Sequence, residues 1–297
     1  MKILVTGKNG QLGFELQRAL APLGAIIAVD REDCDLADAD AIRALVRSVQ
    51  PDLIINPAAY TAVDRAESEP QLATALNALA PAVLGEEATR IGAAVIHYST
   101  DYVFDGTSPR PYVETDATNP LNVYGRTKRD GDLALQQSCP QHLIFRTSWV
   151  VGAHGSNFAK TMLRLAKERD SLSIVADQMG APTSAALLAD VTAQLIGRMQ
   201  REGRNSFPFG LYNCTNGGVT SWHAYACFVL QQALDAGITL KTHPAQVKAI
   251  TTAEYPLPAI RPANSQLDTS LFCATFGLRL PDWQQGLHHI LQQILRP

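Results

Sequence analysis

The first half of the chain alternates short apolar runs with longer amphipathic segments. Runs of three to five apolar residues are typical of strands buried on both faces, and apolar residues spaced three and four positions apart are typical of helices. The apolar runs predict strands over 2–5, 25–29, 53–55, 94–98 and 143–146. The segments between them predict helices over 11–21, 38–49, 70–91 and 124–137. Because such crossovers are right-handed, this order predicts an α/β fold with a doubly wound parallel sheet.

The second half of the chain is less regular. Gly and Pro residues cluster at 152–155, 179–182, 216–218 and 255–262. Such segments are typical of loops, so we expect residues 1–149 to form the main sheet domain and residues 150–297 to form mainly a smaller domain that covers the carboxyl edge of the sheet. The boundary is soft, because a later apolar run at 211–214 is expected to return to the main sheet.

Charge and composition exclude several classes of function. The 297 residues carry a net charge of −3, which provides no general attraction for nucleic acid. No apolar run approaches the roughly 18 residues that a membrane span needs, and the first residues do not resemble a signal peptide, so we expect a cytoplasmic protein with no membrane partner. Five cysteines without a C-x-x-C spacing predict reduced thiols and no zinc site.

A glycine-rich turn follows the first predicted strand directly. Residues 6–13 read Thr-Gly-Lys-Asn-Gly-Gln-Leu-Gly and lead into a helix, with glycines at Gly7, Gly10 and Gly13. Glycines at such a junction allow a tight turn, let backbone N–H groups approach a pyrophosphate and bring the helix close to the strand. We therefore expect the first domain to be a Rossmann domain that binds a dinucleotide.

The end of the second predicted strand leaves the type of dinucleotide open. Asp30 stands where a carboxylate would accept hydrogen bonds from the adenosine ribose, which favours NADH. Arg31 follows at once, and its guanidinium could instead pair with the 2′-phosphate of NADPH. An exposed loop acid is the alternative interpretation of Asp30.

Two further segments predict a reactive site. Tyr124 and Lys128 stand four residues apart at the start of a predicted helix, so their side chains share one face. The preceding strand ends in the hydroxyl residues Ser99 and Thr100, at the sheet edge where ligands bind in this architecture. A phenol, a nearby ammonium that favours its ionisation and a hydroxyl that holds a carbonyl oxygen could together reduce a ketone beside a hydride source.

These motifs together resemble the extended short-chain dehydrogenase/reductase family, and within it the dTDP-4-dehydrorhamnose reductases. The resemblance covers nearly the whole chain, through the turn and the segments 56–64, 99–106, 120–125, 146–150, 177–183 and 261–265. It implies reduction of the C4 ketone of dTDP-4-dehydro-L-rhamnose to dTDP-L-rhamnose by NADPH or NADH. A nucleotide-sugar epimerase or dehydratase of the same fold, and a non-catalytic regulatory subunit, are the alternatives.

The resemblance also implies residue roles. Tyr124, Lys128 and Thr100 would be catalytic. The dinucleotide would contact Gly7, Gly10, Gln11, Leu12, Gly13, Asp30, Arg31, Asp35, Leu36, Ala59, Tyr60, Thr61, Tyr98, Tyr124 and Lys128. The sugar nucleotide would contact Thr100, Asp101, Trp149 and Arg261, although Trp149 could be a core residue and Arg261 could form a structural ion pair.

A magnesium site described for some members is not expected here. Three carboxylates hold that ion at a dimer interface; Glu15 matches the first, whereas the other two positions correspond to Ala186 and Gln293. A hard cation would lose most of its oxygen ligands. We therefore predict no structural magnesium, and leave open whether the protein is a monomer or a homodimer.

Overall fold

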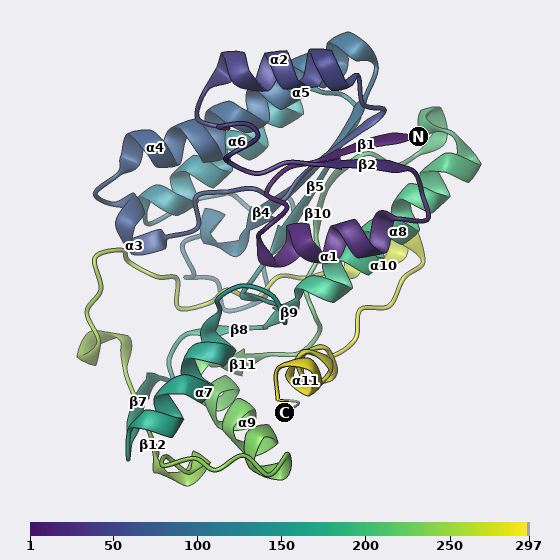
Figure 1. Ribbon diagram of the computed structural model, residues 1–297. Helices are drawn as coiled ribbons and strands as arrows, with labels where there is room; N and C mark the ends of the chain where they lie inside the picture. The colour runs from purple at the N-terminus through teal and green to yellow at the C-terminus, as the bar shows by residue number, and fades with distance from the viewer. Residues whose placement is uncertain (296–297) are drawn as a thin grey trace.

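The computed structural model describes residues 1–295 and contains a six-stranded sheet at its centre (Figure 1). Its spatial order is β10-β5-β4-β3-β1-β2, and every pairing in it is parallel. The strands are β1 (Lys2–Val5), β2 (Ala25–Ala28), β3 (Leu53–Asn56), β4 (Ala94–Thr100), β5 (His142–Thr147) and β10 (Gly210–Asn213). The doubly wound sheet is therefore confirmed, as is the return of the 211–214 run to it.

Helices cover both faces of the sheet because successive strand residues point to opposite sides. Leu4 faces a layer made by α2 (Ala39–Val49), α5 (Ala80–Ile91) and α6 (Val123–Ser138), whereas Ile3 and Val5 face the other layer. That second layer contains α1 (Gln11–Leu20), α8 (Ala185–Glu202) and α10 (Ser270–Phe276) (Figure 1). Because α8 and α10 come from the second half of the chain, residue 150 does not separate two independent cores.

The segment 70–91 is expected to be one helix, but the structure divides it. It forms α4 (Pro70–Thr74), a π-helical stretch over Ala75–Leu79 and α5, while a further short helix, α3, covers Val63–Ala66. Pro81 has no N–H to continue the regular hydrogen-bond ladder, so a widened turn precedes it. Asn77 lies in that turn and its side chain bonds both the N–H and the carbonyl of Tyr60, which anchors the loop after β3.

The remaining elements form a second apolar core beyond the carboxyl edge of the sheet (Figure 1, lower half). Its helices are α7 (Phe158–Glu168), α9 (Trp222–Asp235) and α11 (Trp283–Ile294). Three two-stranded pairings complete it: β7 (Leu172–Val175) with β12 (Val247–Ile250), β6 (Val150–Val151) with β9 (Thr183–Ser184), and β8 (Met179–Gly180) with β11 (Thr220–Ser221). This part therefore lies where it can complete a site at the sheet edge.

The five cysteines are all free thiols, as the spacing predicted. Cys34, Cys139 and Cys214 are buried, and Cys227 and Cys273 are partly buried. Over residues 1–295, no helix combines the length and the apolar character needed to cross a bilayer.

Candidate active site

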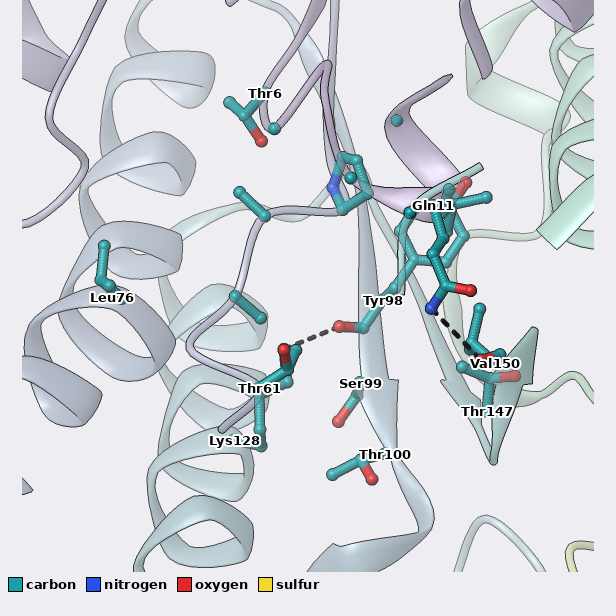
Figure 2. Close-up of a pocket in the computed structure, with 18 of the residues that line it drawn as sticks. Thr6, Gln11, Thr61, Leu76, Tyr98, Ser99, Thr100, Lys128, Thr147 and Val150 are labelled. Carbon is teal, nitrogen blue, oxygen red and sulfur yellow. Dashed lines mark hydrogen bonds between the residues drawn. The ribbon is translucent and has the colours of Figure 1, made fainter. Parts of the chain in front are cut away.

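A cavity of about 690 Å³ opens at the carboxyl edge of the sheet, between the sheet and the second core. It is lined by the turn after β1, the loop after β3, the end of β4, the start of α6 and parts of the segment 147–156. In Figure 2, Lys128 and Thr147 lie on opposite sides of β4. The chain adds β2 on one side of β1 and β3 on the other, so the cavity lies at the topological switch point. Ligands bind in that crevice in open α/β sheets.

The glycine-rich turn leaves space for an anion at one end of the cavity. Gly7 has a φ of +60°, which disfavours other residues. A Cβ on Gly13 would lie 2.0 Å from the Gly7 carbonyl oxygen, so only glycine lets α1 approach the turn this closely. Gly10 precedes α1 and has no side chain to cap it. The first N–H groups of α1 therefore point to the cavity without a side-chain acceptor, an arrangement that suits a pyrophosphate.

An acidic and a basic residue, Asp30 and Arg31, also line the dinucleotide end of the cavity. The carboxylate of Asp30 accepts hydrogen bonds from the Asn9 amide and from the backbone N–H of Glu32, and it lines the cavity. Arg31 also lines it, and its side chain is 82% exposed, with Asp35 4.0 Å away. A ribose hydroxyl and a 2′-phosphate would each find a complementary group here, so the residues fit either dinucleotide.

The opposite end of the cavity brings together the predicted reactive residues. Asn122 caps α6 by accepting a hydrogen bond of 2.7 Å from the Gly125 N–H, which directs the first turn of the helix toward β4. Tyr124 and Thr100 both line the cavity there. Burial raises the pKa of Tyr124, and the Thr100 contact opposes part of that rise. The phenol is therefore protonated at neutral pH and can act as a proton donor.

Lys128 lies one helical turn further along α6 and is buried. Its Nζ donates a 2.7 Å hydrogen bond to the carbonyl oxygen of Tyr98 (Figure 2). The same Nζ lies 3.0 Å from Nε2 of His97. Burial lowers the pKa of Lys128 to about 8, while the carboxylate of Asp132 acts in the opposite direction. An ammonium whose pKa is about 8 therefore lines the cavity one helical turn from Tyr124.

A pair of indoles forms the wall toward the second core. Trp149 adopts a φ of +46° after β5, and its ring stacks on Trp222 at a centroid distance of 3.7 Å. Both residues line the cavity, and the other edge of the Trp149 ring packs against Gly180. Trp149 therefore packs against the second core and also lines the cavity, while its contact with the sugar remains a prediction. The sequence analysis missed Trp222, because it begins α9, 73 positions later, and no local motif marks it.

Asp101 adds a buried carboxylate beside Thr100. Its Oδ1 accepts a hydrogen bond of 2.9 Å from the Thr100 hydroxyl, whereas Oδ2 has no partner among the described residues. Burial raises the pKa of Asp101 to about 6. Since buried polar atoms are normally paired, a hydroxyl-rich ligand suits this lining atom.

Most of the predicted site residues line this one cavity. They are Gly7, Gly10, Gln11, Leu12, Gly13, Asp30, Arg31, Asp35, Leu36, Ala59, Thr61, Tyr98, Thr100, Asp101, Tyr124, Lys128 and Trp149. Tyr98 contributes to the lining, but its hydroxyl is paired with Thr192 at 2.7 Å inside the core.

Two predicted residues lie outside the lining. The phenol of Tyr60 is hydrogen-bonded to Glu69, which is also held by Arg65. Arg261 forms the ion pair that was its alternative, with Asp64 at 2.7 Å and 3.0 Å. The contacts of Tyr60 and Arg261 with a ligand remain predictions.

The three positions of the magnesium site considered above lie on three different helices. Glu15 is buried in α1 and pairs with Arg18 at 3.2 Å, Ala186 is buried in α8, and Gln293 lies in α11. Within residues 1–295, no group of three acidic, His or Cys side chains gathers as a metal site would require. The absence of bound magnesium remains a prediction.

Comparisons with known proteins match the chain over its full length. The family model described as the RmlD substrate binding domain matches residues 1–296. The dTDP-4-dehydrorhamnose reductase of Salmonella typhimurium strain LT2 is 52% identical over 99% of this chain and 98% of its own.

Two solved structures agree with this match. The dTDP-4-dehydrorhamnose reductase of Clostridium acetobutylicum superposes with a TM-score of 0.91 at 36% identity, with all of each chain covered. That of Bacillus anthracis strain Ames, in complex with NADP, superposes with a TM-score of 0.89 at 33% identity, over 98% of this chain and 99% of its own. The chain therefore belongs to the RmlD family of dTDP-4-dehydrorhamnose reductases.

Proposed function

We propose that this protein reduces the C4 ketone of dTDP-4-dehydro-L-rhamnose (dTDP-6-deoxy-L-lyxo-4-hexulose) to the alcohol, giving dTDP-L-rhamnose, with NADPH or NADH as reductant. The observation that carries the proposal is one cavity with a phosphate-binding turn at one end and Thr100, Tyr124 and Lys128 at the other. The full-length identity to reductases of this name supports the same substrate.

The residues at the reactive end have complementary roles. A bound nicotinamide supplies the hydride for the C4 carbon. The Tyr124 phenol, protonated at neutral pH, donates its proton to the C4 oxygen. The Thr100 hydroxyl, which donates to Asp101 in the structure, would turn from that carboxylate to donate to the same oxygen. Lys128 places positive charge near the phenolate that results. These interactions strengthen as negative charge develops on the oxygen, so they stabilise the transition state more than the ketone.

The remaining lining residues would hold the two ligands. The N–H groups that follow Gly10 suit the pyrophosphate of the dinucleotide, and Asp30 and Arg31 suit its adenosine ribose or 2′-phosphate. Asp101 with Thr100, and the stacked pair Trp149 and Trp222, would hold the sugar nucleotide. Arg261, which is paired with Asp64, remains a predicted contact of the sugar nucleotide.

The experiment that tests the proposal follows the absorbance at 340 nm during turnover of the synthetic 4-keto sugar nucleotide, once with NADPH and once with NADH. One NAD(P)H should be consumed for each dTDP-L-rhamnose formed. When dTDP-L-rhamnose is added in place of the ketone, no NAD(P)H should be consumed. Product without net consumption would show an epimerase or dehydratase that regenerates its cofactor. No product from any 4-keto nucleotide sugar would favour a regulatory subunit.

A further inference from the structure

A continuous chain of buried polar side chains lies beneath Lys128, and the mechanism above does not use it. The Thr6 hydroxyl donates to Oδ1 of Asn56 at 2.6 Å, the Asn56 amide nitrogen lies 3.1 Å from Nδ1 of His97, and Nε2 of His97 lies 3.0 Å from Nζ of Lys128. All four residues are at most 1% exposed. Buried polar groups destabilise a core unless they are paired. The positions of these four side chains are therefore restricted by one another.

The sheet itself places these groups in line. Asn56 and His97 are register partners on β3 and β4, so their side chains leave the sheet on the same face, which is the face covered by α6. Thr6 follows β1, the other neighbour of β3, and lines the cavity beside the phosphate-binding turn (Figure 2). This row of four polar side chains therefore extends from the dinucleotide end of the cavity to the ammonium of Lys128 at the reactive end.

The hydrogen-bonding capacity of an ammonium decides which tautomer His97 must have. An ammonium has three donors and no acceptor, so Nε2 of His97 must accept from Lys128. The ring proton is then on Nδ1, and the backbone carbonyl oxygen of Asn56, 3.2 Å away, accepts it. The Asn56 side-chain amide nitrogen, 3.1 Å from Nδ1, is itself a donor and makes no hydrogen bond to the ring in this tautomer. Burial, followed by the nearby charge of Lys128, lowers the pKa of His97 well below its usual value, which keeps the imidazole neutral.

We propose that His97 is a positioning residue for Lys128: its neutral ring, fixed by the backbone carbonyl of Asn56, accepts one hydrogen of the ammonium. The Tyr98 carbonyl accepts a second one. The third hydrogen is then available to the cavity that Lys128 lines. The inference rests on the role of Lys128 in the proposed function, and it adds a residue that touches neither ligand.

Other charged groups around Lys128 do not replace His97. Asp132 lies one turn later on α6, but its carboxylate already accepts a hydrogen bond from Ser99 at 2.7 Å and pairs with Arg146 at 3.4 Å. Tyr124, one turn earlier, is protonated at neutral pH. Loss of His97 would therefore remove an acceptor of Lys128 with no compensating charge, and the pKa of Lys128 would fall further below about 8.

The tautomer can be tested without turnover, by NMR of protein labelled with ¹⁵N-histidine. His97→Gln identifies the signals of His97, and Lys128→Met removes its donor. We expect a neutral ring with the proton on Nδ1 at about pH 6.5, and a change of its ¹⁵N shifts as Lys128 deprotonates near pH 8. That change should be absent in Lys128→Met. A proton on Nε2, or an imidazolium, at about pH 6.5 would overturn the proposal.

Turnover provides a second test. His97→Leu should lower kcat at pH 7.5 by about tenfold and move the alkaline limb of the pH profile down by about one unit, because an uncharged Lys128 no longer assists the phenol. His97→Gln, which keeps a side-chain oxygen acceptor, should restore much of both. Val95→Ala is the matched control, since Val95 is buried two residues earlier on the same face of β4 and is apolar.

The two tests separate a wrong inference from a wrong function. A His97→Leu profile that coincides with that of Val95→Ala would show that His97 only fills space. If the wild-type protein does not consume NAD(P)H at all, the proposed function is wrong, and the NMR experiment still decides whether His97 holds Lys128.

Discussion

The two ends of the cavity are built in different ways. The dinucleotide end consists mainly of one continuous stretch, 6–13, whose form follows from backbone geometry: a positive φ at Gly7 and a close approach at Gly13. The reactive end brings Thr100, Tyr124 and Trp222 together from β4, α6 and α9, which are far apart along the chain. The first end therefore depends on the absence of side chains, and the second depends on particular side-chain atoms.

The largest effect is expected at the reactive end. Tyr124→Phe removes the proton donor but keeps the ring, so kcat should fall by about 10²- to 10⁴-fold. The dissociation constant of NADPH, measured by fluorescence titration, should change less than about threefold, because the turn at 6–13 is untouched.

Tyr225→Phe is the matched control for this change. Tyr225 is also a buried phenol, but it lies in the second core and its hydroxyl has no partner among the described residues. Its replacement should leave kcat unchanged. A Tyr124→Phe enzyme with wild-type kcat would show that another group donates the proton.

The dinucleotide end should be sensitive to a single methyl group. Gly13→Ala would place a Cβ 2.0 Å from the Gly7 carbonyl oxygen, so the turn and α1 must move apart. We expect a loss of about 1–3 kcal/mol in the free energy of unfolding and at least about tenfold weaker NADPH binding. A Cβ on Gly10 would lie 3.3 Å from its nearest protein atom, so Gly10→Ala should have a smaller effect on the free energy of unfolding, although it should still weaken NADPH binding. Equal losses of stability in the two variants would show that the contact at Gly13 does not limit the turn.

The buried carboxyl of Asp101, at the reactive end, should make the stability of the protein depend on pH. The pKa of Asp101 is raised to about 6, so the folded protein binds this proton more tightly than the unfolded chain does. Its stabilising contribution is complete below about pH 4 and is lost as the pH rises through about 6. Between pH 4 and pH 7.5, Asp101→Asn should therefore gain up to about 3 kcal/mol relative to the wild type.

Urea unfolding at both pH values measures this gain. Asp105 provides a control of opposite sign, because hydrogen bonds from the Thr107 N–H, Asn119 and the Thr107 hydroxyl lower its pKa. Asp105→Asn should lose stability relative to the wild type as the pH rises from about 2 to about 4, and should change little between pH 4 and pH 7.5. If the difference in unfolding free energy between Asp101→Asn and the wild type is the same at both pH values, burial does not raise the pKa of Asp101.

The smallest effect is expected at the indole wall. Trp222→Ala removes one ring of the stack with Trp149, and such a pair contributes about 0.5–1.5 kcal/mol. The KM of the sugar nucleotide should rise by about three- to tenfold, whereas the dissociation constant of NADPH should stay constant. Trp222→Phe keeps a ring and should recover most of the affinity. An unchanged KM in Trp222→Ala would show that the second core does not contact the substrate.

Local patterns along the chain predicted the strands well and the division of the helical segment 70–91 poorly. The five strands expected in the first half occur within two residues of their expected ends, because apolar runs between turns have few alternatives. The division of 70–91 was missed, since Pro81 could equally stand inside the first turn of a helix. The π-helical stretch depends on Asn77, whose bonds to Tyr60 and Thr127 form only once three elements meet.

The same distinction applies to the site. Glycine spacing and the Tyr124 and Lys128 pair could be recognised because each motif lies within eight residues. Trp222 and His97 could not, because their partners Trp149 and Lys128 are 73 and 31 positions away. Arg261 shows the reverse case: its charge suited a phosphate, but folding brings it to Asp64, 197 positions away.

By itself, the sequence determined the parallel sheet, the phosphate-binding turn and the identity of the reactive side chains, since these depend on residue type and on neighbours along the chain. Only the tertiary structure decided which side chains share a cavity, that α8, β10 and α10 complete the first core, and that His97 lies beneath Lys128. The physical reason is that register and packing bring distant segments within hydrogen-bond distance, and burial then sets which groups must pair and which can ionise.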